Sequence, residues 1–171
     1  MKTQIKTILI MFCIMSVATL AKAQSAVFSG TWKLTQHTSL SGKDYFNGVP
    51  KSIKVSEADA KLTITRTTNI ATPDDEGTTS TEIFSPDGKP SVTINTTKNT
   101  RTSVIVRGSD QSSFTENTKI TSPAEPNKAL FNISETWALS ADGKNLTLIR
   151  NFSSTTDPND KWSMKGVYQK Q

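Results

Sequence analysis

Cysteine and histidine are almost absent from this sequence of 171 residues, which contains one of each, Cys13 and His37. A single cysteine excludes an internal disulfide. A zinc site of ordinary composition needs several Cys or His ligands and is excluded as well. Three adjacent acids, Asp74, Asp75 and Glu76, are the candidate calcium-binding site, but acids in a turn flanked by proline and glycine are usually solvated. We therefore expect no bound metal and no cofactor.

The sequence also lacks a recognised catalytic motif and a tract rich in lysine or arginine. Neither a nucleophile elbow nor a phosphate-binding loop is present, so we expect a protein that is not an enzyme. A buried carboxylate, Glu116 or Glu135, acting as an acid or base is the remaining catalytic alternative. The formal net charge is +5, and it falls to +2 without the three lysines that precede residue 24. Without a basic tract we expect no binding to nucleic acid.

Residues 1–23 have the pattern of a secretory signal peptide. Lys2 and Lys6 precede an uncharged apolar stretch, which is followed by small residues in Ala21-Lys22-Ala23. An uncleaved membrane anchor is the alternative, but the apolar stretch has about 14 residues and a spanning helix needs about 20. We expect cleavage before Gln24, export to the periplasm or the medium, and no membrane span after cleavage.

Residues 24–171 predict a single all-β domain. Threonine and serine are frequent, the apolar residues alternate with polar ones, and no segment keeps the spacing of an amphipathic helix. Strands at this spacing are typical of a sandwich or an antiparallel barrel, which we expect to be monomeric. The expected strands are 28–35, 51–56, 60–68, 78–85, 89–97, 101–107, 112–121, 130–140, 144–153 and 161–170.

Two Asp-Gly pairs, at 87–88 and 142–143, predict hairpin turns between neighbouring strands. A two-residue loop at Asp142-Gly143 would pair Leu139 with Leu146 and Glu135 with Arg150 across the hairpin. Loops with an odd number of residues would oppose apolar to polar side chains throughout. The alternation therefore predicts that Glu135 and Arg150 face each other on the inner side of the sheet.

Charged residues on the apolar face of several strands are the most informative polar feature. Arg66 and Glu116 share the inward face of their strands with apolar residues, as do Glu135 and Arg150. One interpretation is a structural ion pair between Glu135 and Arg150, extended by Arg66 and Glu116, in which removing Arg150 would leave Glu135 unpaired. The other is an anchor in which Arg150 binds the carboxylate of a ligand and Tyr168 adds a hydroxyl.

The segments "SGTWKL", "ETWALSADGKNLTL" and "KWSMKGVYQKQ" resemble lipocalin-like domains of secreted bacterial proteins. The resemblance covers most of residues 26–171 and implies an up-and-down antiparallel barrel of about 8–10 strands. It implies that Trp32, in Gly30-x-Trp32, packs at the closed end against an arginine from a late strand, for which Arg150 is the candidate. The disulfides of the core lipocalins are absent.

The resemblance also implies a cavity for a small, largely apolar or amphipathic molecule. Trp137 lies on the same inward face as Glu135, and Tyr45 and Phe46 lie between two glycines in the connection after the first strand, where they are able to cap the barrel mouth. A loop that packs its own aromatic residues is the alternative for Tyr45 and Phe46. For the whole protein, the alternative to ligand binding is a filled barrel that presents its outer face to a partner in the cell envelope.

Overall fold

The computed structural model describes residues 28–45, 47–68, 77–94 and 98–171, and this part of the chain contains ten β-strands and no helix. No helix in these ranges is therefore long and apolar enough to cross a membrane. The strands are β1 (Gly30–Ser41), β2 (Ser52–Ala58), β3 (Lys61–Thr68), β4 (Thr78–Phe84), β5 (Ser91–Ile94), β6 (Thr100–Arg107), β7 (Ser113–Ser122), β8 (Glu125–Leu139), β9 (Asn145–Ser154) and β10 (Lys161–Lys170).

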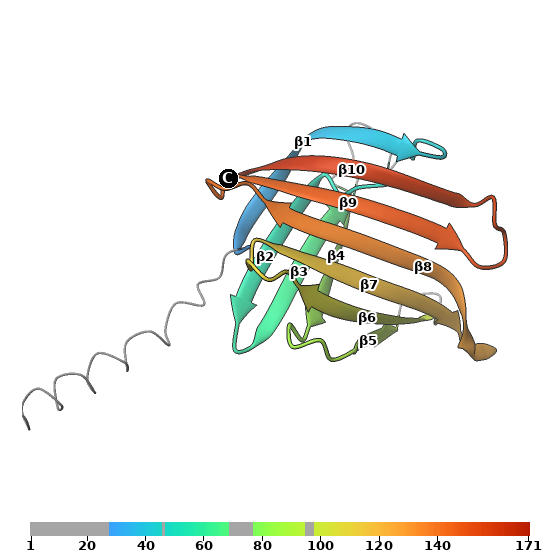
Figure 1. The fold of residues 1–171 in the computed structure, drawn as a ribbon. Coiled ribbons are helices and arrows are strands. Elements are labelled where there is room, and N and C mark those ends of the chain that lie inside the picture. Colours follow the sequence, from blue (N-terminus) through green and yellow to red (C-terminus); the bar gives the residue numbers. More distant parts are fainter. Residues whose placement is uncertain (1–27, 46, 69–76, 95–97) are drawn as a thin grey trace, which may run out of the picture.

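The ten strands form one antiparallel sheet in the order β4-β3-β2-β1-β10-β9-β8-β7-β6-β5. The sheet curls into a nearly closed barrel in which β5–β10 run across one side and β2–β4 cross behind them (Figure 1). Apart from the β1–β10 ladder, every ladder of the sheet joins strands that are consecutive in the sequence, which is the up-and-down topology expected from the alternating pattern. The predicted all-β, up-and-down barrel is thereby confirmed.

Two predicted strand boundaries are wrong. β1 continues to Ser41, six residues beyond its expected end, because register shifts after Leu34 and Ser39 interrupt the alternation while the strand goes on pairing with β10. β8 begins at Glu125 and not at residue 130, so the connection between the expected strands 112–121 and 130–140 shrinks to a turn at Pro123 and Ala124. In both places the strand continues although the apolar pattern does not.

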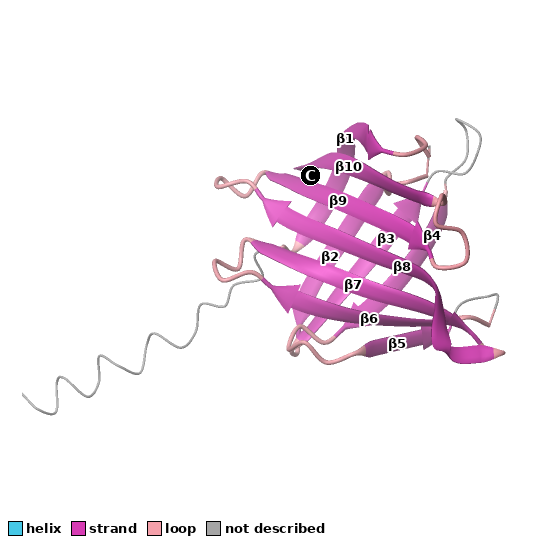
Figure 2. Cartoon of the chain, turned by 45° about the vertical axis from the view of Figure 1, so that its right-hand side comes forward, coloured by secondary structure: helices cyan, strands magenta, loops and turns pink. Residues whose placement is uncertain are grey.

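The barrel has a seam, because the predicted hairpin at Asp87-Gly88 does not pair its two strands. β4 and β5 are the two ends of the sheet order and share no ladder in the described residues, whereas the Asp142-Gly143 hairpin has the predicted register, with Glu135 opposite Arg150. Figure 2 shows β4 behind the front sheet and β5 at its lower edge, running in different directions. The outer side chains near this seam include Ile83, Val92, Ile94 and Val106, each more than half exposed.

The closed end of the barrel contains Trp32, which is fully buried and donates from Nε1 to the carbonyl of Phe28 at 3.0 Å. The Lys170 ammonium lies 5.2 Å from the centre of the Trp32 ring. Gly30 has a φ of 142°, and a Cβ there would lie 2.7 Å from Cε of Lys170, so the Gly-x-Trp spacing lets this lysine cross above the ring. The structure therefore places Trp32 in the core, as predicted.

The expected contact between Arg150 and Trp32 is wrong. Arg150 pairs with Met164 on β10, whereas Trp32 pairs with Lys170, six residues farther along the same strand. Six residues of a β-strand span roughly 20 Å, which a guanidinium does not bridge. The cation above the Trp32 ring is a lysine, and Arg150 lies instead 5.9 Å from the centre of the Trp162 ring.

Candidate functional site

The inner face of the barrel is apolar at the closed end, charged in the middle and aromatic at the open end. On β8 this order is Trp137, Glu135 and Ile133, followed by Phe131, and successive inward residues of β9 repeat it. The core cluster at the closed end consists of Phe28, Trp32, Ile53, Val55, Leu62, Ile64, Phe84, Ile105, Phe114, Trp137, Leu146, Leu148 and Tyr168. The charged middle zone contains four of the predicted site residues.

Arg66 is the centre of this charged zone. Its Nη1 donates to Glu82 at 2.5 Å, and its Nη2 donates to Glu116 at 2.5 Å and to Glu135 at 2.9 Å. Its guanidinium also lies 5.4 Å from the centre of the Trp137 ring, a cation–π contact that joins the charged zone to the apolar core. The side chain of Arg66 is 7% exposed, and those of Glu116 and Glu135 are fully buried.

Two members of the network, Glu82 and Arg101, were not predicted. Arg101 Nη2 donates to Glu116 Oε1 at 2.7 Å, and Arg101 Nε lies 2.6 Å from Glu82 Oε1. Both residues have the parity of an inward neighbour, since Glu82 precedes Phe84 by two positions and Arg101 precedes Ser103 by two. The same inward–outward alternation, extended to β4 and β6, would have identified Glu82 and Arg101.

Arg150 is held more loosely than Arg66. Its Nε lies 3.4 Å from Glu135 Oε1, and neither atom has a hydrogen bond within the described part of the chain. Its Nη1 donates a long hydrogen bond of 3.5 Å to the Gly48 carbonyl. Glu135 is therefore neutralised chiefly by Arg66, and the expectation that removal of Arg150 would leave Glu135 unpaired is wrong.

The charges of the network set the protonation of its members. Although burial alone would raise it, the pKa of Glu135 is lowered to about 2 by Arg66, Arg150 and Arg101. Burial opposes the charged form of Arg66 too, but Glu135, Glu116 and Glu82 raise its pKa above the ordinary value. With three arginines and three glutamates in contact, the charges of the middle zone balance.

Tyr168 lies at the edge of this zone and its hydroxyl is already bonded. It is fully buried and donates to the Pro50 carbonyl at 2.9 Å. Burial raises the pKa of Tyr168 well above its ordinary value, and the Glu135 carboxylate adds to the shift. The tyrosine therefore stays a neutral donor, and its single proton is used within the protein.

Four aromatic side chains form a row at the open end of the barrel. The centres of neighbouring rings lie 5.4 Å apart for Tyr45 and Trp162, 5.3 Å for Trp162 and Phe152, and 5.5 Å for Phe152 and Phe131. All four are partly exposed. Tyr45 thus lies at the mouth, and Phe46 is outside the described residues; Trp137 is fully buried in the core, where it stacks on Phe114.

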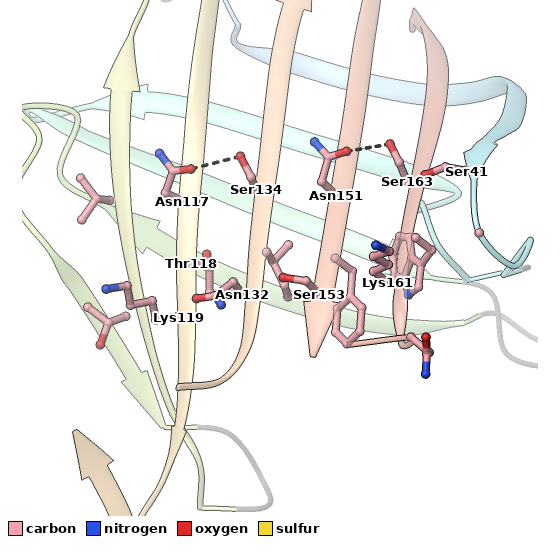
Figure 3. Close-up of a pocket in the computed structure, with 17 residues that line it drawn as sticks. Ser41, Asn117, Thr118, Lys119, Asn132, Ser134, Asn151, Ser153, Lys161 and Ser163 are labelled. Atoms are coloured by element: carbon pink, nitrogen blue, oxygen red, sulfur yellow. Dashed lines mark hydrogen bonds between the residues drawn. The ribbon is translucent and has the colours of Figure 1, made fainter. Parts of the chain in front are cut away.

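A hollow of about 850 Å³ lies on the outer face of the sheet, where sequence reasoning expected no site. In Figure 3 the labelled side chains of Asn117, Ser134, Asn151 and Ser163 lie in front of β7–β10, while other strands of the barrel cross behind. Its lining consists of Ser41, Gly42, Thr102, Val104, Asn117, Thr118, Lys119, Asn132, Ile133, Ser134, Asn151, Phe152, Ser153, Asn159, Lys161, Trp162 and Ser163.

The outward side chains of the hollow form two polar rows across neighbouring strands. In the first row Asn117, Ser134, Asn151, Ser163 and Ser41 are successive cross-strand partners from β7 to β1. The second row runs two residues farther along, where cross-strand pairing joins in turn Lys119, Asn132, Ser153 and Lys161. Such rows depend on the registers of several ladders at once, so the sequence alone does not indicate them.

No group of three or more His, Cys, Asp or Glu side chains able to hold a metal ion is found within the described ranges. Asp74, Asp75 and Glu76 lie outside those ranges. No protein-family model matches the chain, and a comparison with curated proteins finds no similar sequence.

Removal of Arg66 is predicted to destabilise the protein far more than removal of Arg150. Arg66→Met leaves three glutamates with too few partners and should cost roughly 3–5 kcal/mol, the usual cost of breaking a buried ion pair. Arg150→Met should cost roughly 1–2 kcal/mol, because Glu135 keeps Arg66. Urea denaturation of both variants measures the difference, and equal losses would contradict the central position of Arg66.

The low pKa of Glu135 predicts that stability falls as the pH falls from about 4.5 to about 2. In that interval the unfolded chain takes up a proton that the folded protein does not, so protonation favours unfolding. The Glu135 contribution, roughly 3 kcal/mol, is fully present above pH 4.5. Glu135→Gln should be less stable at neutral pH but should lose less on acidification; parallel stability curves for the two proteins would rule out this linkage.

Proposed function

We propose that this protein is an exported, non-enzymatic binding protein that holds its ligand on the outer face of β6–β10. The observation that carries the proposal is the hollow of about 850 Å³ on that face. The interior, by contrast, is occupied by an apolar core and by a charged zone whose members bond to one another. Export is supported by the signal-like residues 1–23.

The charge network also favours binding over catalysis. A general acid or base needs a pKa near the working pH and contact with a substrate. Glu135 has a pKa of about 2 and is enclosed by arginines, and Glu116 is fully buried between Arg66 and Arg101. The Glu135 carboxylate is therefore unsuited to proton transfer at neutral pH, and burial keeps Glu116 from contact with a substrate.

Filling the hollow with a large side chain tests the proposal. Ser134 lies within the first row, so Ser134→Trp should abolish retention of components from an envelope extract of the source organism on the immobilised protein. Thr136→Trp is the matched control, because it adds the same side chain two residues along β8, outside the lining. Mass spectrometry identifies the retained material, and retention that is unchanged by Ser134→Trp would exclude the outer face.

The open end of the barrel supports a second candidate function, the binding of a small amphipathic anion. The four partly exposed rings offer an apolar surface, and Arg150 lies at its inner edge with a buried Nε that has no hydrogen bond in the described chain. A carboxylate is able to pair with such a guanidinium while the apolar part of the ligand covers Trp162. This version keeps the ligand class expected from the lipocalin-like resemblance.

Naphthalene-1-carboxylate is a suitable probe for this second site. Because the ring would stack on Trp162 and the carboxylate would pair with Arg150, Trp162→Ala and Arg150→Met should each weaken binding about tenfold in calorimetric titrations. Lys33→Met on the exposed side of β1 serves as the control for lost charge. Equal affinity of the wild type and Trp162→Ala would reject the mouth as a binding site.

A further inference from the structure

The hollow on the outer face has an unbalanced charge. Its seventeen lining residues include two lysines and no aspartate or glutamate. Neither the Lys119 nor the Lys161 ammonium forms an ion pair within the described ranges, and both side chains are exposed. They stand on opposite sides of the hollow (Figure 3), on β7 and β10, and three strand spacings of about 4.8 Å separate their backbones by roughly 14 Å. A ligand here would meet positive charge at both sides.

Between the lysines, the first row contains the same hydrogen-bonded unit twice. Ser134 donates from its hydroxyl to the Asn117 amide oxygen at 3.0 Å, and Ser163 donates to the Asn151 amide oxygen at 2.7 Å. Each bond fixes an asparagine so that its NH₂ group remains to donate to a ligand. The two units lie two strands apart, roughly 10 Å, so they are placed to contact successive units of a repeating polymer.

The chemistry of the lining selects among anionic polymers. Hydroxyl and amide groups match a ligand rich in hydroxyls, since each of them is able to donate and accept hydrogen bonds. Single-stranded nucleic acid binds by stacking its bases on exposed aromatic rings. Phe152 and Trp162 are among the lining residues, but their rings belong to the inner aromatic row, where each already has two ring neighbours. Among the described residues, the outer face of the hollow therefore offers no ring on which a base could stack.

We propose that the outer-face hollow binds an acidic polysaccharide, with Lys119 and Lys161 pairing with its carboxylates and the two Asn–Ser units binding its hydroxyls. This inference rests on the proposed outer-face function and specifies its ligand. The ligand class follows from three features of one surface: a hollow large enough for several sugar rings, a repeated amide–hydroxyl unit, and unpaired positive charge at both sides.

Oligogalacturonate, a polymer of uronic acids, provides a defined probe, and its methyl ester provides a neutral probe of the same shape. Calorimetric titration should show binding of the acid form and at least about tenfold weaker binding of the ester. The double variant Lys119→Ala/Lys161→Ala should lose a similar factor for the acid form only. Asn117→Ala/Asn151→Ala should weaken the binding of both polymers, because it removes hydrogen bonds and no charge.

Lys54→Ala is the matched control, since Lys54 is an exposed lysine on β2, outside the hollow. Equal binding of the acid and the ester, or an equal loss in Lys54→Ala, would overturn the inference. So would equally tight binding of a single-stranded DNA oligonucleotide with the same dependence on Lys119 and Lys161, because the surface would then bind any polyanion. If oligogalacturonate fails to bind while Ser134→Trp still abolishes retention of envelope material, the ligand class fails and the outer-face function stands.

Discussion

The position of Arg66 is the constraint on which the rest of this barrel depends. A barrel normally closes by backbone hydrogen bonds between the two edge strands of its sheet, but here the edge strands β4 and β5 share no ladder in the described residues. Arg66 on β3 instead bonds to Glu82 on β4, Glu116 on β7 and Glu135 on β8. Arg101 on β6 contacts Glu82 and Glu116 from the other side of the seam. Side-chain charges thus connect the two edges that the backbone leaves apart.

This form of closure has consequences for both faces of the barrel. Inside, the buried members of the network, Arg66, Glu116 and Glu135, must stay dry and paired, because an unpaired charge among them would cost several kcal/mol. Outside, the free edges of β4 and β5 have no partner strand among the described residues, and Val92 and Ile94 on the short β5 are 61% and 73% exposed. The short length of β5 and the Lys89-Pro90 pair that precedes it are features that limit strand addition at such an edge.

Much of the fold was predictable from the sequence, because alternation is a local property. It placed Glu135 opposite Arg150 and put Trp32, Trp137 and Tyr168 inside, as the structure shows. The pairing partners of an interior charge are not local, however: Glu135 lies opposite Arg150 but bonds to Arg66, which is 69 residues away in the sequence. Likewise, the Asp-Gly signal at 87–88 predicts a turn but does not determine whether the strands on either side pair.

The same distinction separates the two candidate sites. The mouth residues follow from the inner-face pattern of β9 and β10, so the sequence pointed toward Arg150 and its surroundings. The outer hollow arises from the ladders β6–β7, β7–β8, β8–β9 and β9–β10, whose registers bring small polar residues of distant segments into line. From the sequence alone, an outer face rich in serine and threonine cannot be told apart from any other solvated strand surface. In the folded protein this face becomes a distinct surface, because it is hollowed and two lysines without acidic partners in the described chain lie at its sides. Inside the barrel the charged side chains bond to one another, so the outer surface is the stronger candidate for binding.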